Sequence, residues 1–240
     1  MLKHSKFIYD PISNIIKDAV KATSGLSCRM ETYPMSEYLF QSVFLKMTGA
    51  SEQKLKCICW DIATYDYEYR YSYLKDHHGE CSDKTDKNNI FKGICECIRK
   101  KDETFNLNCI IPDKKNFINE VRNAVVDNIK GTVLSQWKKK DFEFFCKNNG
   151  FVVDTQLKCS CNCILENKVW EDYEEFVYKH RNRCAHNLES YQTNLPTLSK
   201  LSSNRHEYDN YFYRFSILIL LDKIAILLYD TYLKTLENSY

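Results

Sequence analysis

Apolar residues recur at helical spacing along most of this chain. Leu39, Val43 and Met47 lie four residues apart, and this spacing predicts a helix that Gly49 closes. Asp10-Pro11 is typical of a helix start. The stretch from Tyr208 to Leu236 is apolar on most sides and is predicted to be the central core helix. Other helices are predicted over residues 90–100, 118–129, 134–147 and 169–184.

Five tyrosines alternate with polar residues between Tyr65 and Tyr73. Alternation alone favours a strand, whereas Asp66 and Arg70, four residues apart, favour a helix. No breaker separates this run from the apolar residues before it, so we expect one helix over residues 52–75. Such tyrosines either stack on RNA bases or half-bury their rings in a bundle or dimer face.

Two further segments, 105–111 and 157–163, also alternate apolar and polar residues, and we expect them to pair as a small antiparallel ribbon. Residues 76–89 and 187–206 are polar and are predicted loops. Few glycines and prolines in 240 residues favour long helices. The predicted fold class is therefore all-α, with a region that holds a short β-hairpin.

The formal net charge is only +2, so any surface that binds nucleic acid must be local. The N-terminus is not a signal peptide, and no stretch is suited to crossing a membrane, so we expect a cytoplasmic protein with reduced thiols. The cysteines follow a Cys-x-Cys spacing rather than that of common zinc modules, and His77, His78 and Cys81 are a weak ligand cluster. We expect no metal and no cofactor.

The segment from Lys179 to His186 contains the pattern Arg181-Asn182-x3-His186. Cleavage of RNA without a metal requires proton transfers and neutralisation of the phosphorane charge. Histidine suits the proton transfers because its pKa lies near neutrality. Arginine suits the phosphate because its charge is permanent and its donors form a planar fork. Arg181, Asn182 and His186 are the candidate catalytic residues.

The spacing of this motif bears on oligomeric state. Arg181 and His186 are five residues apart and point to different sides of a helix, so one copy makes a poor site. Two copies that face each other across a two-fold axis bring both pairs into one cleft, which predicts a homodimer with a composite site. Lys179, His180 and Arg183 are weaker candidates for contacts with neighbouring phosphates. The alternative is that they are solvated cations near a helix C-terminus.

The motif resembles the HEPN family (higher eukaryote and prokaryote nucleotide-binding domains), whose members carry Arg-x4–6-His, commonly with Asn after the Arg. In that family the motif lies near the end of one bundle helix, before a loop and a final long helix, as in this chain. The resemblance covers residues 35–75 and 169–236. Residues 1–240 are then one HEPN-like domain, within which 76–168 is an insertion.

The resemblance implies a helical bundle, a homodimer and a metal-independent endoribonuclease that leaves a 2′,3′-cyclic phosphate. It also implies a prokaryotic toxin or anti-phage defence effector, with an antitoxin or another defence-system protein as partner. Some toxin members carry a Tyr two residues after the His, which a nucleotidyltransferase modifies. Leu188 stands there in this chain, which argues against that mode of control.

Two other functions fit the same sequence. A non-catalytic HEPN-like module would use the motif as an anion site for RNA, a nucleotide or a protein. A structural interaction protein would dock partners through residues 76–168 and would be indifferent to changes in the motif. Cleavage of RNA, as opposed to binding alone, separates the enzyme from both.

Overall fold

The structure is a computed structural model that describes residues 4–75, 81–148, 152, 154–160, 163–186 and 206–238. The N-terminal part comprises α1 (Ser5–Tyr9), α2 (Ser13–Ala22), α3 (Tyr33–Tyr65) and α4 (Tyr67–Lys75). The middle comprises α5 (Lys84–Lys101), α6 (Leu107–Ile110), α7 (Lys114–Ile129), α8 (Val133–Trp137), α9 (Lys139–Lys147), β1 (Leu157–Ser160) and β2 (Cys163–Leu165). The C-terminal part comprises α10 (Asn167–Asp172), a π-helix (Tyr173–Tyr178), α11 (Lys179–His186) and α13 (Tyr211–Glu237).

The predicted fold class is confirmed. The described part is helical apart from short connections and one two-stranded antiparallel sheet, β1–β2. Among the described residues, no helix combines the length and the apolar composition that a membrane span requires.

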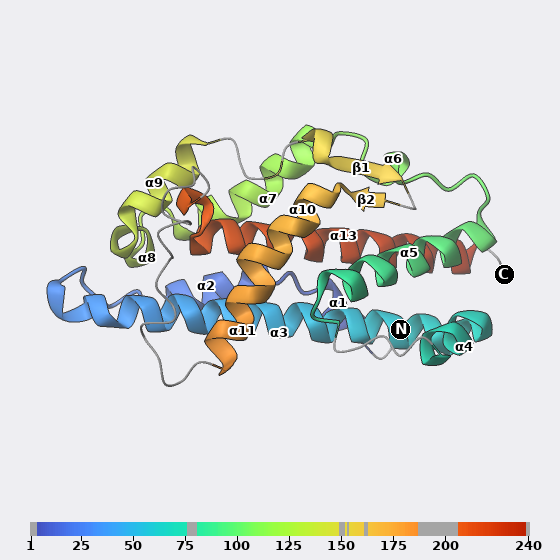
Figure 1. Ribbon diagram of the computed structural model, residues 1–240, viewed down its shortest axis with the longest axis horizontal. Coiled ribbons are helices and arrows are strands. Elements are labelled where there is room, and N and C mark those ends of the chain that lie inside the picture. Colours follow the sequence, from blue (N-terminus) through green and yellow to red (C-terminus); the bar gives the residue numbers. More distant parts are fainter. Residues whose placement is uncertain are drawn as a thin grey trace.

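Helix α13 lies at the centre of the molecule, as its all-round apolar sequence predicted. Figure 1 shows it between α3 on one side and α7 on the other, and it packs against α3, α5 and α7. Asn210 caps its start, because its side-chain oxygen accepts hydrogen bonds from the backbone amides of Phe212 and Tyr213. The hydrophobic core is therefore built around this helix.

Helix α3 joins two segments that the sequence predicted as separate helices, one ending at Gly49 and one over residues 52–75. The predicted end at Gly49 is wrong, since α3 runs through it from Tyr33 to Tyr65. Buried residues on both sides of Gly49, such as Phe44 and Leu55, belong to one core, and their burial outweighs the low helix propensity of one glycine.

The predicted uninterrupted helix over 52–75 is wrong at one residue. The backbone of Asp66 is extended and ends α3, and its carboxylate accepts a hydrogen bond from the amide of Tyr69 in α4. The tyrosine run is nevertheless helical. Tyr69 is buried against α5, where a Cβ at Gly93 would lie 3.1 Å from its ring.

The region predicted to be an insertion contributes directly to the core, because α5 and α7 both pack on α13. The predicted loop over 76–89 is wrong from Lys84 onward, where α5 begins with Asp83 as its cap. The predicted ribbon is also wrong in its partner. Residues 107–110 form the helical turn α6, capped by Asn106, and β1 pairs instead with β2, which follows it closely in the sequence.

A buried ion pair fixes the N-terminal helices to the core. Lys54 Nζ on α3 lies 2.5 Å from Asp222 Oδ1 on α13 and donates to the carbonyl oxygen of Asp10 at 2.7 Å. The other oxygen of Asp222 accepts a hydrogen bond from the amide of Ile12 at 3.1 Å. The connection between α1 and α2 is thus held by side chains from both long helices.

Candidate functional site

The candidate motif lies on α11, which continues a helical run that begins with α10. Between them the backbone forms a π-helix, Tyr173–Tyr178, a feature that is rare and often found at functional sites. Arg214 of α13 is buried, and its Nε donates a hydrogen bond to the carbonyl oxygen of Phe176 at 2.9 Å. Arg214 also pairs with Asp209. A cation from the central helix therefore holds the segment directly before the motif.

Arg181 projects from α11 toward α3. Its Nη2 lies 3.5 Å from Glu52 Oε2, and its Nη1 donates to Asn182 Oδ1 at 3.2 Å. The Arg181 side chain is 29% exposed and that of Glu52 is 14% exposed. Both contacts are long, and a guanidinium carries five N–H donors. Arg181 is therefore oriented by two partners, and its other donors have no partner among the described residues, so an anion such as a phosphate can bind there.

Sequence reasoning missed Glu52. Nothing in the sequence next to Glu52 distinguishes it from the other polar residues on α3. Only the packing of α11 across α3 brings it to Arg181. No spacing rule within one segment predicts such a contact between residues 129 positions apart.

Lys87 is a second residue near this site that the sequence did not single out. It is 1% exposed, its Nζ donates to the carbonyl oxygen of Cys81 at 2.7 Å, and it lies 5.6 Å from the centre of the Tyr173 ring. The Tyr173 hydroxyl in turn donates to the carbonyl oxygen of Ser82 at 2.5 Å. Burial lowers the pKa of Lys87 to about 8, and the Glu52 carboxylate counters part of that shift. The start of α5 is thus tied to the π-helix.

The flanking cations do not gather around Arg181. His180 packs between Phe44 and Tyr211, with ring centres 5.1 and 5.5 Å away. Lys179 is exposed and pairs with Glu175 at 2.7 Å, one turn earlier. Arg183 is half-buried, close enough to Arg214 for their charges to repel. These geometries favour packing for His180 and a surface ion pair for Lys179.

His186 is the last residue of α11, so the backbone of the whole Arg181-Asn182-x3-His186 pattern is helical. The side chain of His186 lies outside the described residues, as do all residues of the predicted loop over 187–206 except the last. The meeting of Arg181 with His186 and the composite site across a two-fold axis therefore stay predictions.

Two buried cysteines, Cys59 and Cys97, have strongly raised thiol pKa values. Burial raises the pKa of Cys59 and Cys97 to about 12, so both stay protonated at neutral pH. Among the described residues, no group of three His, Cys, Asp or Glu side chains is arranged to hold a metal ion. Cys161 and the side chains of Cys159 and Cys163 lie outside that part.

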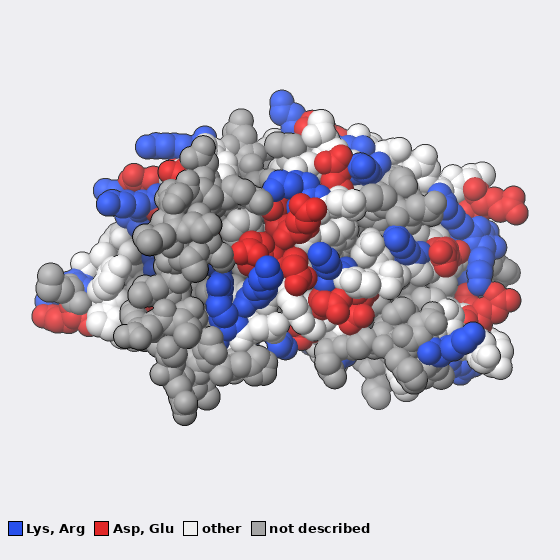
Figure 2. All heavy atoms as spheres, viewed as in Figure 1, with Lys and Arg blue, Asp and Glu red and all other residues white. Residues whose placement is uncertain are grey.

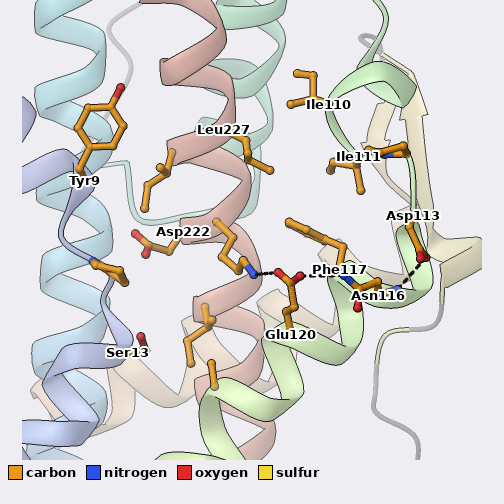
Figure 3. A pocket seen from close by; sticks show the side chains of 16 residues that line it. Tyr9, Ser13, Ile110, Ile111, Asp113, Asn116, Phe117, Glu120, Asp222 and Leu227 are labelled. Carbon is orange, nitrogen blue, oxygen red and sulfur yellow. Dashed lines mark hydrogen bonds and ion pairs between the residues drawn. The ribbon is translucent and has the colours of Figure 1, made fainter.

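A cavity of about 560 Å³ lies away from the motif, between the α1–α2 connection, α6, α7 and α13 (Figure 3). Its lining is mainly apolar and includes Ile111, Phe117 and Leu227. Lys223 and Glu120, which both line it, pair at 2.6 Å, and Lys223 Nζ lies 5.1 Å from the centre of the Phe117 ring. No residue of the Arg181 motif lines this cavity.

Figure 2 shows acidic and basic side chains interspersed on the face that it draws, rather than one continuous basic field. This agrees with the net charge of +2. Binding of a polyanion to that face therefore has to come from a few specific contacts. The chain matches no protein-family model, no curated protein and no solved structure.

Proposed function

We propose that this protein is a metal-independent endoribonuclease that acts as a homodimer, with Arg181, Asn182 and His186 at its active site. The observation that carries the proposal is Arg181 itself. It stands on the same short helix as His186 and is held at the surface by Glu52 and Asn182, and among the described residues only two of its five N–H donors have partners. The resemblance to HEPN nucleases supplies the reaction.

In the proposed reaction the ribose 2′-oxygen loses its proton and attacks the adjacent phosphorus. The bond from phosphorus to the 5′-oxygen then breaks, and that oxygen gains a proton. The products are a 2′,3′-cyclic phosphate and a 5′-hydroxyl. His186 moves the proton at one of these oxygens, and the Arg181 guanidinium neutralises the charge that builds on the phosphorane. Asn182 orients the Arg181 side chain.

Glu52 is a positioning residue in this scheme, because it contacts Arg181 and not the RNA. Its carboxylate limits where the guanidinium can lie without occupying all of its donors. A similar pairing with a carboxylate orients catalytic groups in many enzymes. Removal of the Glu52 carboxylate is expected to misplace the Arg181 guanidinium, which keeps its positive charge.

The proposed cellular role is that of a cytoplasmic toxin or anti-phage effector, controlled by an antitoxin or another defence-system partner. Expression of the wild-type chain should then arrest growth of the host cell. Arg181→Ala should relieve the arrest at an equal protein level. Arrest that persists in Arg181→Ala would contradict this role.

The test is cleavage of a mixed single-stranded RNA in EDTA by the wild type and by His186→Ala. We expect cleavage by the wild type, with cyclic phosphate ends, and a loss of about 10²–10⁴-fold in His186→Ala. Arg99→Ala, which removes an exposed arginine from the last turn of α5, is the matched control and should cleave normally.

Two results would overturn the proposal. Equal cleavage by His186→Ala and the wild type would show that the activity lies elsewhere. RNA binding that depends on Arg181, with no cleavage by the wild type, would favour the non-catalytic module. The long contact between Arg181 and Glu52 is compatible with that function, since an anion can also bind there without reaction.

A further inference from the structure

The cavity between the α1–α2 connection, α6, α7 and α13 has the size of a small-molecule site. Protein interiors contain few voids larger than a water molecule, whereas pockets that bind small molecules measure about 300–1,000 Å³. This cavity, with a volume of about 560 Å³, lies within that range. Since its lining is mainly apolar, an apolar molecule that enters it exchanges contact with water for contact with these side chains.

Three distant parts of the chain form the walls of the cavity. Figure 3 shows Tyr9 on the side opposite Ile110 and Ile111, with Leu227 of α13 between them. Ile111 and Phe117 are buried, whereas Tyr9 is exposed. The cavity therefore combines an apolar floor with an edge that solvent reaches.

The walls are held in place by contacts within the chain. Asp113 accepts a hydrogen bond from the amide of Asn116 at 2.9 Å and so caps α7. The side chain of Asn116 donates to Glu120 Oε1 at 2.8 Å, one turn further along α7. On the side of α13, Asp222 is fixed by Lys54 at 2.5 Å. The cavity is therefore preformed, as most small-molecule sites are.

The charged side chains in the lining already have partners. Lys223 pairs with Glu120, and Asp222 pairs with Lys54. The carboxylate of Asp113 lies at the start of α7, where the helix dipole favours a negative charge. A charged ligand would have to break one of these interactions or lose its hydration without gaining a counter-charge, and either is costly. An uncharged ligand requires neither.

We propose that this cavity binds a small, uncharged and mainly apolar molecule. The apolar floor takes the body of the molecule, and a single hydroxyl or carbonyl group lies at the exposed edge beside Tyr9. This inference does not depend on the proposed nuclease, because no residue of the Arg181 motif lines the cavity.

The experiment uses isothermal titration calorimetry with three probes that share one aromatic body. Naphthylmethanol is uncharged, naphthoate is an anion and naphthylmethylamine is a cation. For the wild type we expect naphthylmethanol to bind with a Kd of about 100 μM or below. Both ions should bind about tenfold more weakly or worse, because they lose hydration without a free counter-charge.

A ring placed inside the cavity tests the location. Ala124 is a half-buried lining residue of α7, so Ala124→Phe should weaken the binding of naphthylmethanol about tenfold or more by occupying its space. The matched control is Asn123→Phe, which adds the same ring at the neighbouring exposed position, outside the lining, and should bind like the wild type. Circular dichroism should show the same helical content in both variants.

A charge change at the surface tests the class of ligand. Glu120→Gln removes the counter-charge of Lys223 while it keeps the size of the side chain. Naphthoate should then bind about threefold more tightly than it binds the wild type, because the ion pair with Glu120 no longer competes for Lys223. The affinity for naphthylmethanol should stay unchanged.

Several results would overturn the inference. The location is wrong if naphthylmethanol does not bind the wild type, or binds Ala124→Phe equally well. The class of ligand is wrong if the wild type prefers either ion to naphthylmethanol. Should Ala124→Phe fail to fold, an unchanged affinity of Glu120→Gln for naphthoate would still contradict the proposal. Because no RNA is present in these measurements, their failure leaves the proposed nuclease site unaffected.

Discussion

Glu52 and Lys54 lie two residues apart on α3, and each forms an ion pair with a residue of another helix. The environments of the two pairs differ sharply. Lys54 and Asp222 lie in the core, each side chain 2% exposed, with 2.5 Å between Nζ and Oδ1. Glu52 and Arg181 lie at the edge of the fold, 14% and 29% exposed, with 3.5 Å between Oε2 and Nη2. The first pair also binds backbone groups of Asp10 and Ile12.

This comparison distinguishes a pair that fixes the fold from a pair that leaves a cation accessible at the surface. The core pair is buried and also binds backbone groups of the α1–α2 connection, so it is closed to a ligand and serves to fix the N-terminal helices. Burial raises the pKa of Asp222 in spite of Lys54, which shows that desolvation opposes the pair. The surface pair is more exposed, and only two of the five N–H donors of Arg181 have partners among the described residues, which leaves room for an anion beside it.

The largest effect is expected from breaking the core pair. Lys54→Met should lower the free energy of unfolding by about 3–5 kcal/mol, because it leaves Asp222 buried without a counter-charge. Denaturant titration measures this change. The double variant Lys54→Met/Asp222→Leu should recover most of the loss, since a well-packed apolar pair replaces the ions. A double variant as unstable as Lys54→Met would refute the explanation by desolvation.

Lys87 tests how burial affects a cation beside the surface pair. It titrates near pH 8 in the folded protein, against an ordinary value of 10.5. Between these values the unfolded chain binds a proton that the folded chain lacks, so stability should rise with pH. The slope is at most about 1.4 kcal/mol per pH unit.

The measurement is the free energy of unfolding of the wild type and Lys87→Met at pH 8 and pH 10. Subtracting the value of the variant from that of the wild type at each pH cancels the contribution of the thiols and tyrosines, which titrate in the same range. The difference, wild type minus variant, should increase with pH. A difference that stays constant, or that falls, would contradict the lowered pKa of Lys87.

A smaller effect is expected from Glu52→Gln at the surface pair. Arg181 keeps its contact with Asn182, so RNA cleavage should fall by about tenfold rather than be lost. Unfolding should change by less than about 1 kcal/mol, because the pair is partly exposed. Glu120→Gln is the matched control, since Glu120 also pairs with a cation at the surface, Lys223 at 2.6 Å, and this variant should cleave normally. Unchanged cleavage in Glu52→Gln would remove Glu52 from the site.

The sequence predicted features that depend on local spacing. The central helix α13 follows from apolar periodicity over one segment, whereas the helix predicted over 169–184 covers Arg181 and Asn182 but ends two residues before His186, the last residue of α11. The end of α3 did not follow, because tertiary burial carries the helix through Gly49, and a single extended residue, Asp66, stops it. Alternation predicted a strand over 157–163, but β1 ends at Ser160 and pairs with β2, which is nearer in the sequence than the predicted partner 105–111.

The candidate site shows the same division. Arg181, Asn182 and His186 were found together because they lie within six residues. Glu52, Lys87 and Arg214 were missed because packing alone brings α3, α5 and α13 to the motif. The π-helix before the motif has no sequence signature that we recognise, and its stabilising hydrogen bond comes from a residue 38 positions away.

The most direct test measures RNA cleavage and unfolding on the same preparation of Arg181→Ala. Our account predicts that cleavage falls by about 10²–10³-fold while the free energy of unfolding stays within about 1 kcal/mol of the wild type. Cleavage at the wild-type rate would contradict the assignment of Arg181 to the active site. A loss of stability as large as that expected for Lys54→Met would show that the Arg181 pair is structural as well.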